Sequence, residues 1–176
     1  MFENALDLPL NPRPTVWSGA ASESLAQQWT SSAQTRSGEA ICIRPLRPDD
    51  REREIAFING LSAQSRYFRW LTPLKVLPPH LVDQLMDVDY RRRMAFVATI
   101  ERDGKEEFVG IARYGEADEE GTAELGITVA DAWHRRGIAR LLVTELIRFA
   151  RWRGMTRLTG IVLPCLLYTS PSPRDS

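Results

Sequence analysis

The stretch from Thr122 to Leu163 constrains the fold most, because a strand, a long helix and a second strand follow one another directly. Residues 122–129, TAELGITV, alternate between two chemically different faces, as a strand does. The stretch that follows carries apolar residues at helical spacing, at Ile138, Leu141, Leu142, Leu146, Phe149 and Ala150. Residues 157–163, RLTGIVL, predict another strand. Such a succession forms a right-handed unit whose two strands are parallel.

The strands upstream of this unit are expected to be antiparallel. AFVATIE (95–101) and EEFVGIARY (106–114) flank Asp103-Gly104, a strong signal for a short hairpin. AICIRPL (40–46) predicts an earlier strand. Helices are expected over residues 48–59, 62–71 and 78–86. We therefore predict an α/β (α+β) domain whose mixed central sheet is flanked by helices.

Residues 1–39 differ from the rest of the chain. They contain three prolines, a Ser/Ala/Gln-rich stretch and two isolated tryptophans, Trp17 and Trp29, without a sustained period. We interpret this segment as a flexible leader that contains a short helix around Leu25. The alternative is a segment that docks through its tryptophans.

Charge and hydropathy exclude several classes of protein. The chain has 23 basic and 23 acidic residues, so it lacks the excess positive charge of a nucleic-acid binder. It has no apolar run long enough to cross a bilayer, and its first residues do not form a secretory signal. Two cysteines form no disulfide framework, and His80 and His134 lack the spacing of metal ligands. We predict a cytoplasmic protein that binds neither nucleic acid nor membrane and needs no metal.

The segment WHRRGIAR (133–140) carries the sharpest chemical signal. Arg135 and Arg136 are expected at the start of a helix, where a positive charge is unfavourable by up to about 1 kcal/mol. Gly137 in a first helical turn costs roughly another 1 kcal/mol relative to alanine. A bound anion such as a pyrophosphate would compensate for both costs, because helix amides and arginines attract it and glycine lets it approach. The alternative is a solvated basic helix end.

Glu124 is the second candidate. It shares a strand face with Gly126 and Thr128, and glutamate is an unfavourable strand residue. A carboxylate beside an anion site could act as a general base. If the preceding turn is centred on Asp118-Glu119, however, Arg113 lies opposite Glu124, and the two form a cross-strand ion pair.

Two short segments carry weaker signals. Residues 65–67, Ser-Arg-Tyr, either line a substrate cleft or belong to a core helix, and the arginines at 91–93 indicate a solvated turn. The sequence contains no G-x-S-x-G nucleophile motif and no P-loop.

In their order along the chain, these segments resemble the GNAT superfamily of acyl-CoA-dependent N-acetyltransferases. The most specific matches are IRPLRPDD, LSAQSRYFRWL, DYRRRMAFVA, VGIARY, AELGITV and WHRRGIAR. They are similar to the acetyltransferase domain of bacterial Pat-type protein lysine acetyltransferases, which is often fused to a large acyl-CoA-synthetase-like region. Because a short leader precedes the match here, we expect a stand-alone member whose domain spans residues 40–164.

The resemblance implies a site. The family's pyrophosphate loop, Q/R-x-x-G-x-G/A, falls on residues 134–139, where His134 departs from the first position. The pyrophosphate of acetyl-CoA would be held by the backbone of Arg135, Arg136, Gly137, Ile138, Ala139 and Arg140. The pantetheine arm would pair like an extra strand with the backbone of Ile127, Thr128 and Val129. Glu124 matches the position of the general base proposed for Pat-type domains.

The last twelve residues, CLLYTSPSPRDS (165–176), do not continue this pattern. Their first eleven are identical to one reading frame of a transposase-based sequencing adapter, so we interpret 165–176 as an artefactual tail. After the strand that ends in VLP, the family continues with a helix and two strands. That helix often supplies the residue that protonates the leaving thiolate. We therefore expect a truncated domain and assign no general acid.

The function implied by the resemblance is transfer of an acetyl group from acetyl-CoA to an amine by direct attack, with a protein lysine as the expected acceptor. A lysine amine has a pKa of about 10.4, so a base must remove a proton before it attacks. Three alternatives remain at this point. The acceptor could be a small molecule or a protein N-terminus, the chain could bind acyl-CoA without catalysis, or it could be an inactive fragment.

Overall fold

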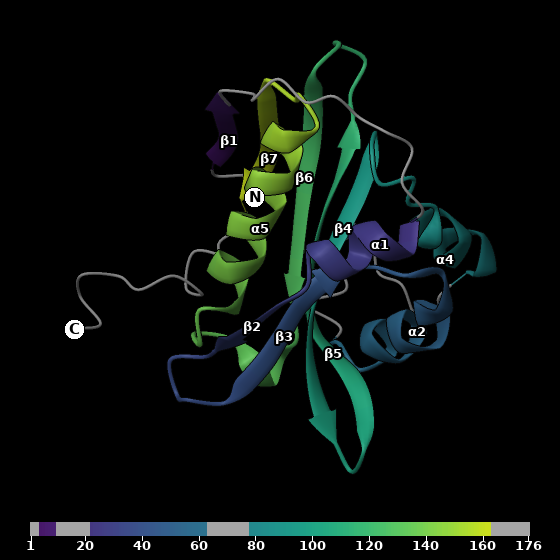
Figure 1. Cartoon of the computed structure of the whole chain (residues 1–176), viewed down its shortest axis with the longest axis vertical. Coiled ribbons are helices and arrows are strands. Elements are labelled where there is room, and N and C mark those ends of the chain that lie inside the picture. The colour runs from purple at the N-terminus through teal and green to yellow at the C-terminus, as the bar shows by residue number, and fades with distance from the viewer. Residues whose placement is uncertain (1–3, 10–21, 63–77, 163–176) are drawn as a thin grey trace.

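The computed structural model describes residues 4–9, 22–62 and 78–162. In these residues a seven-stranded sheet has the order β1-β7-β6-β5-β4-β3-β2 (Figure 1). The strands are β1 (Asn4–Pro9), β2 (Ser31–Gln34), β3 (Ala40–Pro45), β4 (Arg93–Arg102), β5 (Lys105–Glu116), β6 (Thr122–Val129) and β7 (Arg157–Val162). Strands β6 and β7 are parallel and the other neighbours are antiparallel, which confirms the predicted mixed sheet.

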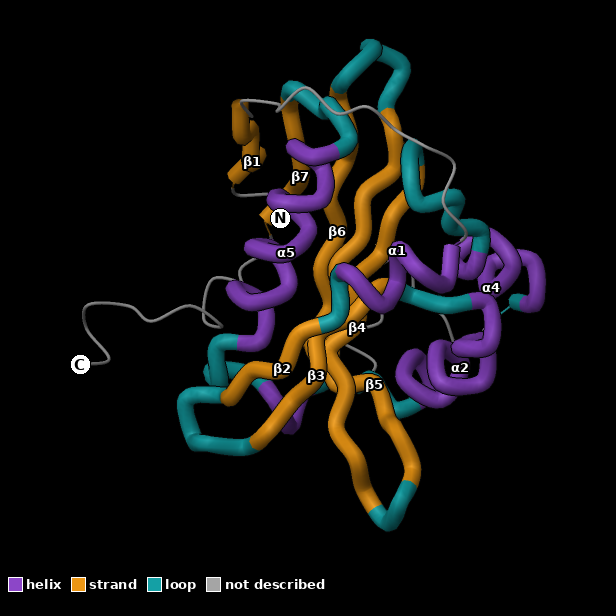
Figure 2. The backbone as a smooth tube through the Cα atoms, viewed as in Figure 1, coloured by secondary structure: helices purple, strands orange, loops and turns teal. Residues whose placement is uncertain are grey.

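Helices cover both faces of the sheet (Figure 2). They are α1 (Ser22–Gln28), α2 (Arg51–Asn59), α4 (Pro79–Met86) and α5 (Ile138–Trp152), with short 3₁₀ turns η1 (Pro48–Asp50) and η2 (Asp131–Trp133). Helices α1 and α5 share one core with the sheet, and α2 and α4 share the core on the opposite face. Within the described ranges, no helix has the length and apolar character needed to cross a membrane.

Helix α5 is held tightly against the centre of the sheet. Its apolar stripe is buried at Ile138, Leu142, Leu146, Phe149 and Ala150. Gly110 on β5 makes the close approach possible, because a Cβ there would lie 3.0 Å from Leu142 Cδ1 and 3.1 Å from Ile138 Cγ2. The contact with Ile138 fixes the first turn of α5 against β5.

The segment predicted as a flexible leader contains regular structure from Ser22 onward. The expected helix around Leu25 is present as α1, and β2 pairs antiparallel with β3. Leu25 is 4% exposed, and the ring of Trp29 packs edge-on against Phe149 with centroids 5.2 Å apart. An isolated tryptophan shows no period in the sequence, so its burial depends on partners that only the tertiary structure supplies. Further upstream, β1 pairs antiparallel with β7.

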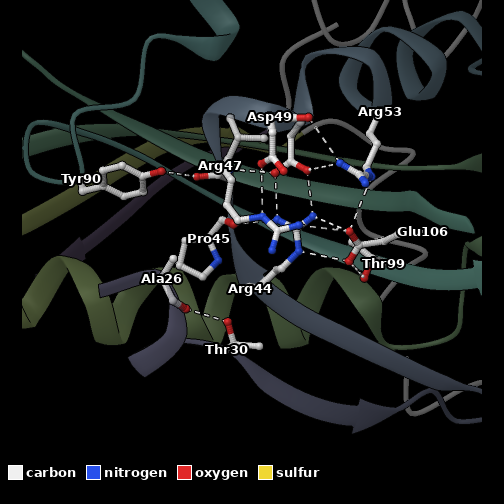
Figure 3. A network of polar contacts seen from close by, with 12 residues as sticks. Ala26, Thr30, Arg44, Pro45, Arg47, Asp49, Arg53, Tyr90, Thr99 and Glu106 are labelled. Atoms are coloured by element: carbon white, nitrogen blue, oxygen red, sulfur yellow. Dashed lines mark hydrogen bonds and ion pairs between the residues drawn. The ribbon is translucent and has the colours of Figure 1, made fainter. Parts of the chain in front are cut away.

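A group of polar and charged side chains around the buried Arg44 joins β3, β4, β5 and the start of α2 (Figure 3). We call it the Arg44 network; its members are Arg44, Arg47, Asp50, Arg53, Thr99 and Glu106. The Arg44 guanidinium makes two 2.8 Å bonds to the carboxylate of Asp50, and its Nε and Nη2 donate to Glu106 at 3.1 and 2.8 Å. Arg44 is 3% exposed and Asp50 is completely buried, so this network fixes η1 and α2 on the sheet.

Some predictions fall on residues that the structure does not describe. Most of the helix expected over 62–71, including the candidate residues 65–67, lies outside the described ranges, as does the segment 165–176.

Candidate functional site

Strands β6 and β7 pair over only half of β6. Their register runs from Thr122 opposite Arg157 to Leu125 opposite Gly160. Among the described residues, β7 does not pair with the second half of β6, residues 126–129. The sheet therefore has an internal edge there, and this edge leads toward the loop before α5.

The pairing of β6 with β5 shows which backbone groups face this edge. Two hydrogen bonds, from Ala130 N–H to Val109 O (2.8 Å) and from Ala117 N–H to Thr122 O (2.7 Å), set the alternation of the ladder. In an antiparallel ladder, residues two apart point their backbone groups the same way. Even-numbered residues such as Thr128 therefore point toward β5, and Ile127 and Val129 point toward the open edge. Three residues are predicted to pair with the pantetheine arm. One of them, Thr128, has its backbone groups turned away from the open edge.

The loop before α5 adopts an unusual backbone conformation. Gly137 precedes the first helical residue and has φ +86°, and Arg135 has φ +62°. The expectation that Gly137 lies in the first helical turn is thus wrong, because the helix begins at Ile138. Glycine is required at 137 by its left-handed conformation instead. The first turn of α5 leaves N–H groups without intrahelical acceptors, and they open onto this loop.

Arg136 is held by Trp133 and by residues of a distant turn. Its guanidinium lies 4.7 Å from the ring centroid of Trp133 and forms an ion pair with Glu39. The backbone N–H of Arg36 donates to Arg136 O at 3.0 Å. The Thr35 hydroxyl and the Arg136 charge hold the pKa of Glu39 below its usual range, with the hydroxyl as the larger cause. Sequence reasoning missed Glu39, which lies 97 positions from Arg136 and carries no local signal.

His134 closes the end of β6. Its Nε2 lies 2.8 Å from Val129 O, and since a carbonyl only accepts, the ring nitrogen must be the donor. This bond takes up the Val129 carbonyl at the open edge and leaves the N–H of Val129 there. The residue that departs from the family pattern therefore ties the loop to the strand.

Glu124 lies on the face of β6 that points toward α2 and α4. Its neighbour across the ladder is Gly115, whereas Arg113 lies opposite Gly126. The predicted ion pair between Arg113 and Glu124 is therefore wrong. Arg113 instead bonds Glu54 Oε1 at 2.9 Å and donates to Leu85 O at 2.9 Å, because the register is shifted by two residues from the one assumed. Burial lowers the pKa of Arg113, and Glu54 counteracts that shift.

The Glu124 side chain lines a cavity of about 480 Å³. We call it the β6 cavity; it lies between α4 and strands β4, β5 and β6. Three carboxylates line it, and two are paired: Asp87 with Arg93 at 3.4 Å, and Glu116 with Arg92 at 3.2 Å. Glu124 is exposed and, within the described part of the chain, its side chain makes no hydrogen bond or ion pair. It is thus the carboxylate there that is free to accept a proton.

The remaining candidate side chains are either solvated or already hydrogen-bonded. The arginines at 91–93 are exposed, as predicted for a solvated turn. Tyr114 lines the β6 cavity, but its hydroxyl donates to Arg91 O at 2.8 Å and burial raises its pKa. His80 is exposed on α4, and the part of the chain that the structure describes contains no group of three or more potential metal ligands.

The fold is that of an acyltransferase. Residues 55–165 match the acetyltransferase (GNAT) family, and the chain belongs to that family. The predicted fold and enzyme class are thereby confirmed, and the family implies an acyl-CoA donor.

Individual relatives narrow the resemblance. Acetyltransferase PA5475 of Pseudomonas aeruginosa is 45% identical over 124 residues, which cover 70% of this chain and 67% of that protein. Acetyltransferase Pat of Mycolicibacterium smegmatis is 31% identical over 131 residues, or 74% of this chain, which spans only 38% of Pat. The GNAT domain of S. lividans PAT superposes with a TM-score of 0.70 at 31% identity, covering 78% of this chain and 80% of that one. These matches confirm the predicted likeness to Pat-type domains.

Proposed function

We propose that this chain transfers the acetyl group of acetyl-CoA to the amine of a protein lysine. The observation that carries the proposal is the open half of β6, because it runs between the two parts of the site. Glu124 and its cavity lie at one end, and the loop before α5 lies at the other. At about 3.3 Å per residue, the five steps from Glu124 to Val129 span roughly 17 Å. An extended donor can lie along this edge.

The donor side of the site consists of backbone groups. The N–H of Ile127 and of Val129 and the C=O of Ile127 face the open edge, where they can pair with the amides of a pantetheine arm. The amides at the start of α5, from Gly137 to Arg140, suit a diphosphate. The positive φ of Gly137 and its missing side chain let phosphate oxygens approach the backbone. When bound, acetyl-CoA supplies a thioester carbonyl for attack by the amine.

The acceptor side of the site is the β6 cavity. A lysine ammonium cannot attack, and Glu124 removes its proton, directly or through a water molecule. Because the carboxylate has no partner in the described residues, it loses no ion pair when it takes that proton. The free amine then attacks the carbonyl carbon, and the C–S bond breaks without a covalent enzyme intermediate. The departing thiolate takes up the second proton of the attacking nitrogen, so the products are a thiol and an amide.

A lysine acceptor is favoured over other amines by the relatives. Two similar proteins carry the name Pat. The resemblance of the sequence to Pat-type lysine acetyltransferases supports a lysine as the acceptor. The β6 cavity is also open to the surface through exposed residues such as Gln84 and Glu124, which suits a side chain presented by a protein.

The test uses the full chain with acetyl-CoA and a set of acceptors. These are a lysine peptide, the same peptide with its lysine side chains blocked but a free N-terminus, and a small polyamine. Thiol release measures turnover, and calorimetry measures acetyl-CoA binding. We expect turnover with the lysine peptide. Turnover confined to the free N-terminus or the polyamine would assign the acceptor to another class, and binding without thiol release would identify a non-catalytic domain.

Glu124→Gln tests the base. We expect kcat to fall by about 10²–10⁴-fold, with the Kd for acetyl-CoA unchanged. Glu119→Gln is the matched control, because it removes the same charge from an exposed turn residue outside the β6 cavity. Equal turnover of the two variants would reject Glu124 as the base.

A further inference from the structure

The turn between β2 and β3 docks onto the loop before α5. We call residues 35–39 the docking turn. It is closed by bonds between its ends: Thr35 N–H donates to Glu39 O at 3.0 Å, and Glu39 N–H donates to Thr35 Oγ1 at 3.1 Å. Thr35 is only 5% exposed, so the turn has a fixed shape.

Two contacts join the docking turn to Arg136. The N–H of Arg36 donates to the Arg136 carbonyl at 3.0 Å, and Glu39 pairs with the Arg136 guanidinium. One contact fixes the backbone of the loop and the other fixes the side chain. The docking turn therefore sets how the loop presents its arginines.

The side chain of Arg36 lies over Gly137. A Cβ at Gly137 would lie 3.6 Å from Arg36 Nε and 3.7 Å from Arg36 Cγ. The Arg36 guanidinium thus lies beside the backbone that precedes the first turn of α5. In the described residues the Arg36 side chain makes no hydrogen bond or ion pair, in contrast to that of Arg136.

We propose that Arg36 is a phosphate-binding residue of the acyl-CoA site and that Glu39 positions Arg136 beside it. This inference rests on the proposed function, and it extends the site to residues outside the segment 55–165 that matches the family. A planar guanidinium with free donors is suited to bidentate contact with phosphate oxygens. Since Glu39 already neutralises Arg136, Arg36 supplies the positive charge that faces the ligand.

The experiment compares Arg36→Ala with the unchanged chain, using three donors. Acetyl-CoA has a 3′-phosphate and a diphosphate, acetyl-dephospho-CoA has only the diphosphate, and S-acetylpantetheine has neither. We expect Arg36→Ala to raise the KM for acetyl-CoA about tenfold, without changing kcat or the kcat/KM for S-acetylpantetheine. Arg36→Lys should restore part of the loss. A penalty that persists with acetyl-dephospho-CoA assigns the contact to the diphosphate, and one that disappears assigns it to the 3′-phosphate.

The matched control is Arg151→Ala, which removes an exposed arginine from the last turn of α5. Its KM for acetyl-CoA should equal that of the unchanged chain. The proposal for Arg36 is overturned if Arg36→Ala binds acetyl-CoA as the control does, or if it loses as much with S-acetylpantetheine. Failure of the proposed function looks different, because then the unchanged chain itself does not use acetyl-CoA.

Discussion

Two clusters of arginines in the described residues differ in almost every physical respect. In the Arg44 network, a buried guanidinium is matched by the carboxylates of Asp50 and Glu106 (Figure 3). At the start of α5, Arg135 and Arg140 are exposed, and Arg136 is paired with the partly exposed Glu39. The loop there also has two residues with positive φ, whereas the backbone of Arg44 lies in a regular strand.

The difference shows how to separate a structural arginine from a ligand-binding one. A buried charge must be matched by partners inside the protein, and the Arg44 network does so with bidentate bonds. Arg36 is exposed beside the helix amides and makes no ion pair in the described residues, so it can gain a partner from outside. Changes in the first cluster should therefore affect stability, and changes in the second should affect donor binding.

The largest effect is expected from Asp50→Ala. Removing this buried carboxylate takes away one of the two bidentate partners of Arg44 and the acceptor of the Arg47 N–H, which should cost about 3–5 kcal/mol of unfolding free energy. Denaturant unfolding measures the loss. Asp49→Ala is the control, because Asp49 is 71% exposed and its removal should change stability by less than about 0.5 kcal/mol. Equal losses for the two variants would contradict the structural role of the network.

Gly137→Ala should have a smaller effect on stability and a specific one on binding. The φ of +86° disfavours any L side chain by about 1–2 kcal/mol. Gly154 has φ +88° at the other end of α5, so Gly154→Ala carries matched strain far from the loop. We expect similar losses of Tm, but a raised KM for acetyl-CoA only in Gly137→Ala. A raised KM in both variants would point to strain rather than to the donor site.

Arg136→Ala should change Tm little and raise the KM for acetyl-CoA severalfold. The side chain of Arg136 is 33% exposed, so loss of its ion pair is screened by solvent. Arg148→Ala removes another arginine that forms an ion pair, here with Glu145 on the outer surface of α5. The Tm of Arg148→Ala should change about as little as that of Arg136→Ala. Its KM for acetyl-CoA should not change. If Arg136→Ala instead unfolds the protein, the second cluster is structural after all.

The smallest effect is a difference in acid sensitivity. Hydrogen bonds from Arg44 hold the pKa of Glu106 below its ordinary value of 4.5. A carboxyl with a lowered pKa in the folded state stabilises the protein above its unfolded pKa, and this contribution is lost as pH falls through the folded pKa. The stability gap between the unchanged chain and Glu106→Gln should therefore be full above about pH 4.5 and shrink below it. Thermal unfolding from pH 7 to pH 3 measures this gap.

The corresponding variant of the second cluster is Glu39→Gln. The pKa of Glu39 is also lowered, so its contribution has the same sign and the same pH window. It should be smaller because solvent screens this exposed carboxylate. A Glu39→Gln gap as large as that of Glu106→Gln would show that the docking turn carries stability as well as position.

Strong local patterns predicted most of the fold. The alternation in TAELGITV, the Asp103-Gly104 turn and the apolar stripe of α5 each reflect packing on a single element, so they could be recognised without partners. The segment before Ala40 carries no such local pattern. Strand β2 is an edge strand with mostly exposed side chains, and Trp29 is buried by residues far along the chain.

The candidate site was predicted less completely. The sequence pointed to Glu124 and to the loop at 135–140, because residues that violate local propensities stand out in a chain. It placed Arg113 against the wrong partner, since a shift of two residues in register is invisible when the turn length is uncertain. Glu39 and Arg36 gave no signal at all, because an exposed polar turn is ordinary by itself.

The sequence by itself determined most elements from Ala40 onward and their order, since periodicity and short motifs are properties of neighbouring residues. The resemblance of these segments to a known family indicated the acyltransferase class. The tertiary structure alone decided which backbone groups of β6 stay open, that Glu124 has no partner in the described residues, and that a distant turn holds Arg136. These features depend on strand register and on contacts between residues far apart in the chain. Both are set by the packing of the whole domain rather than by local preference.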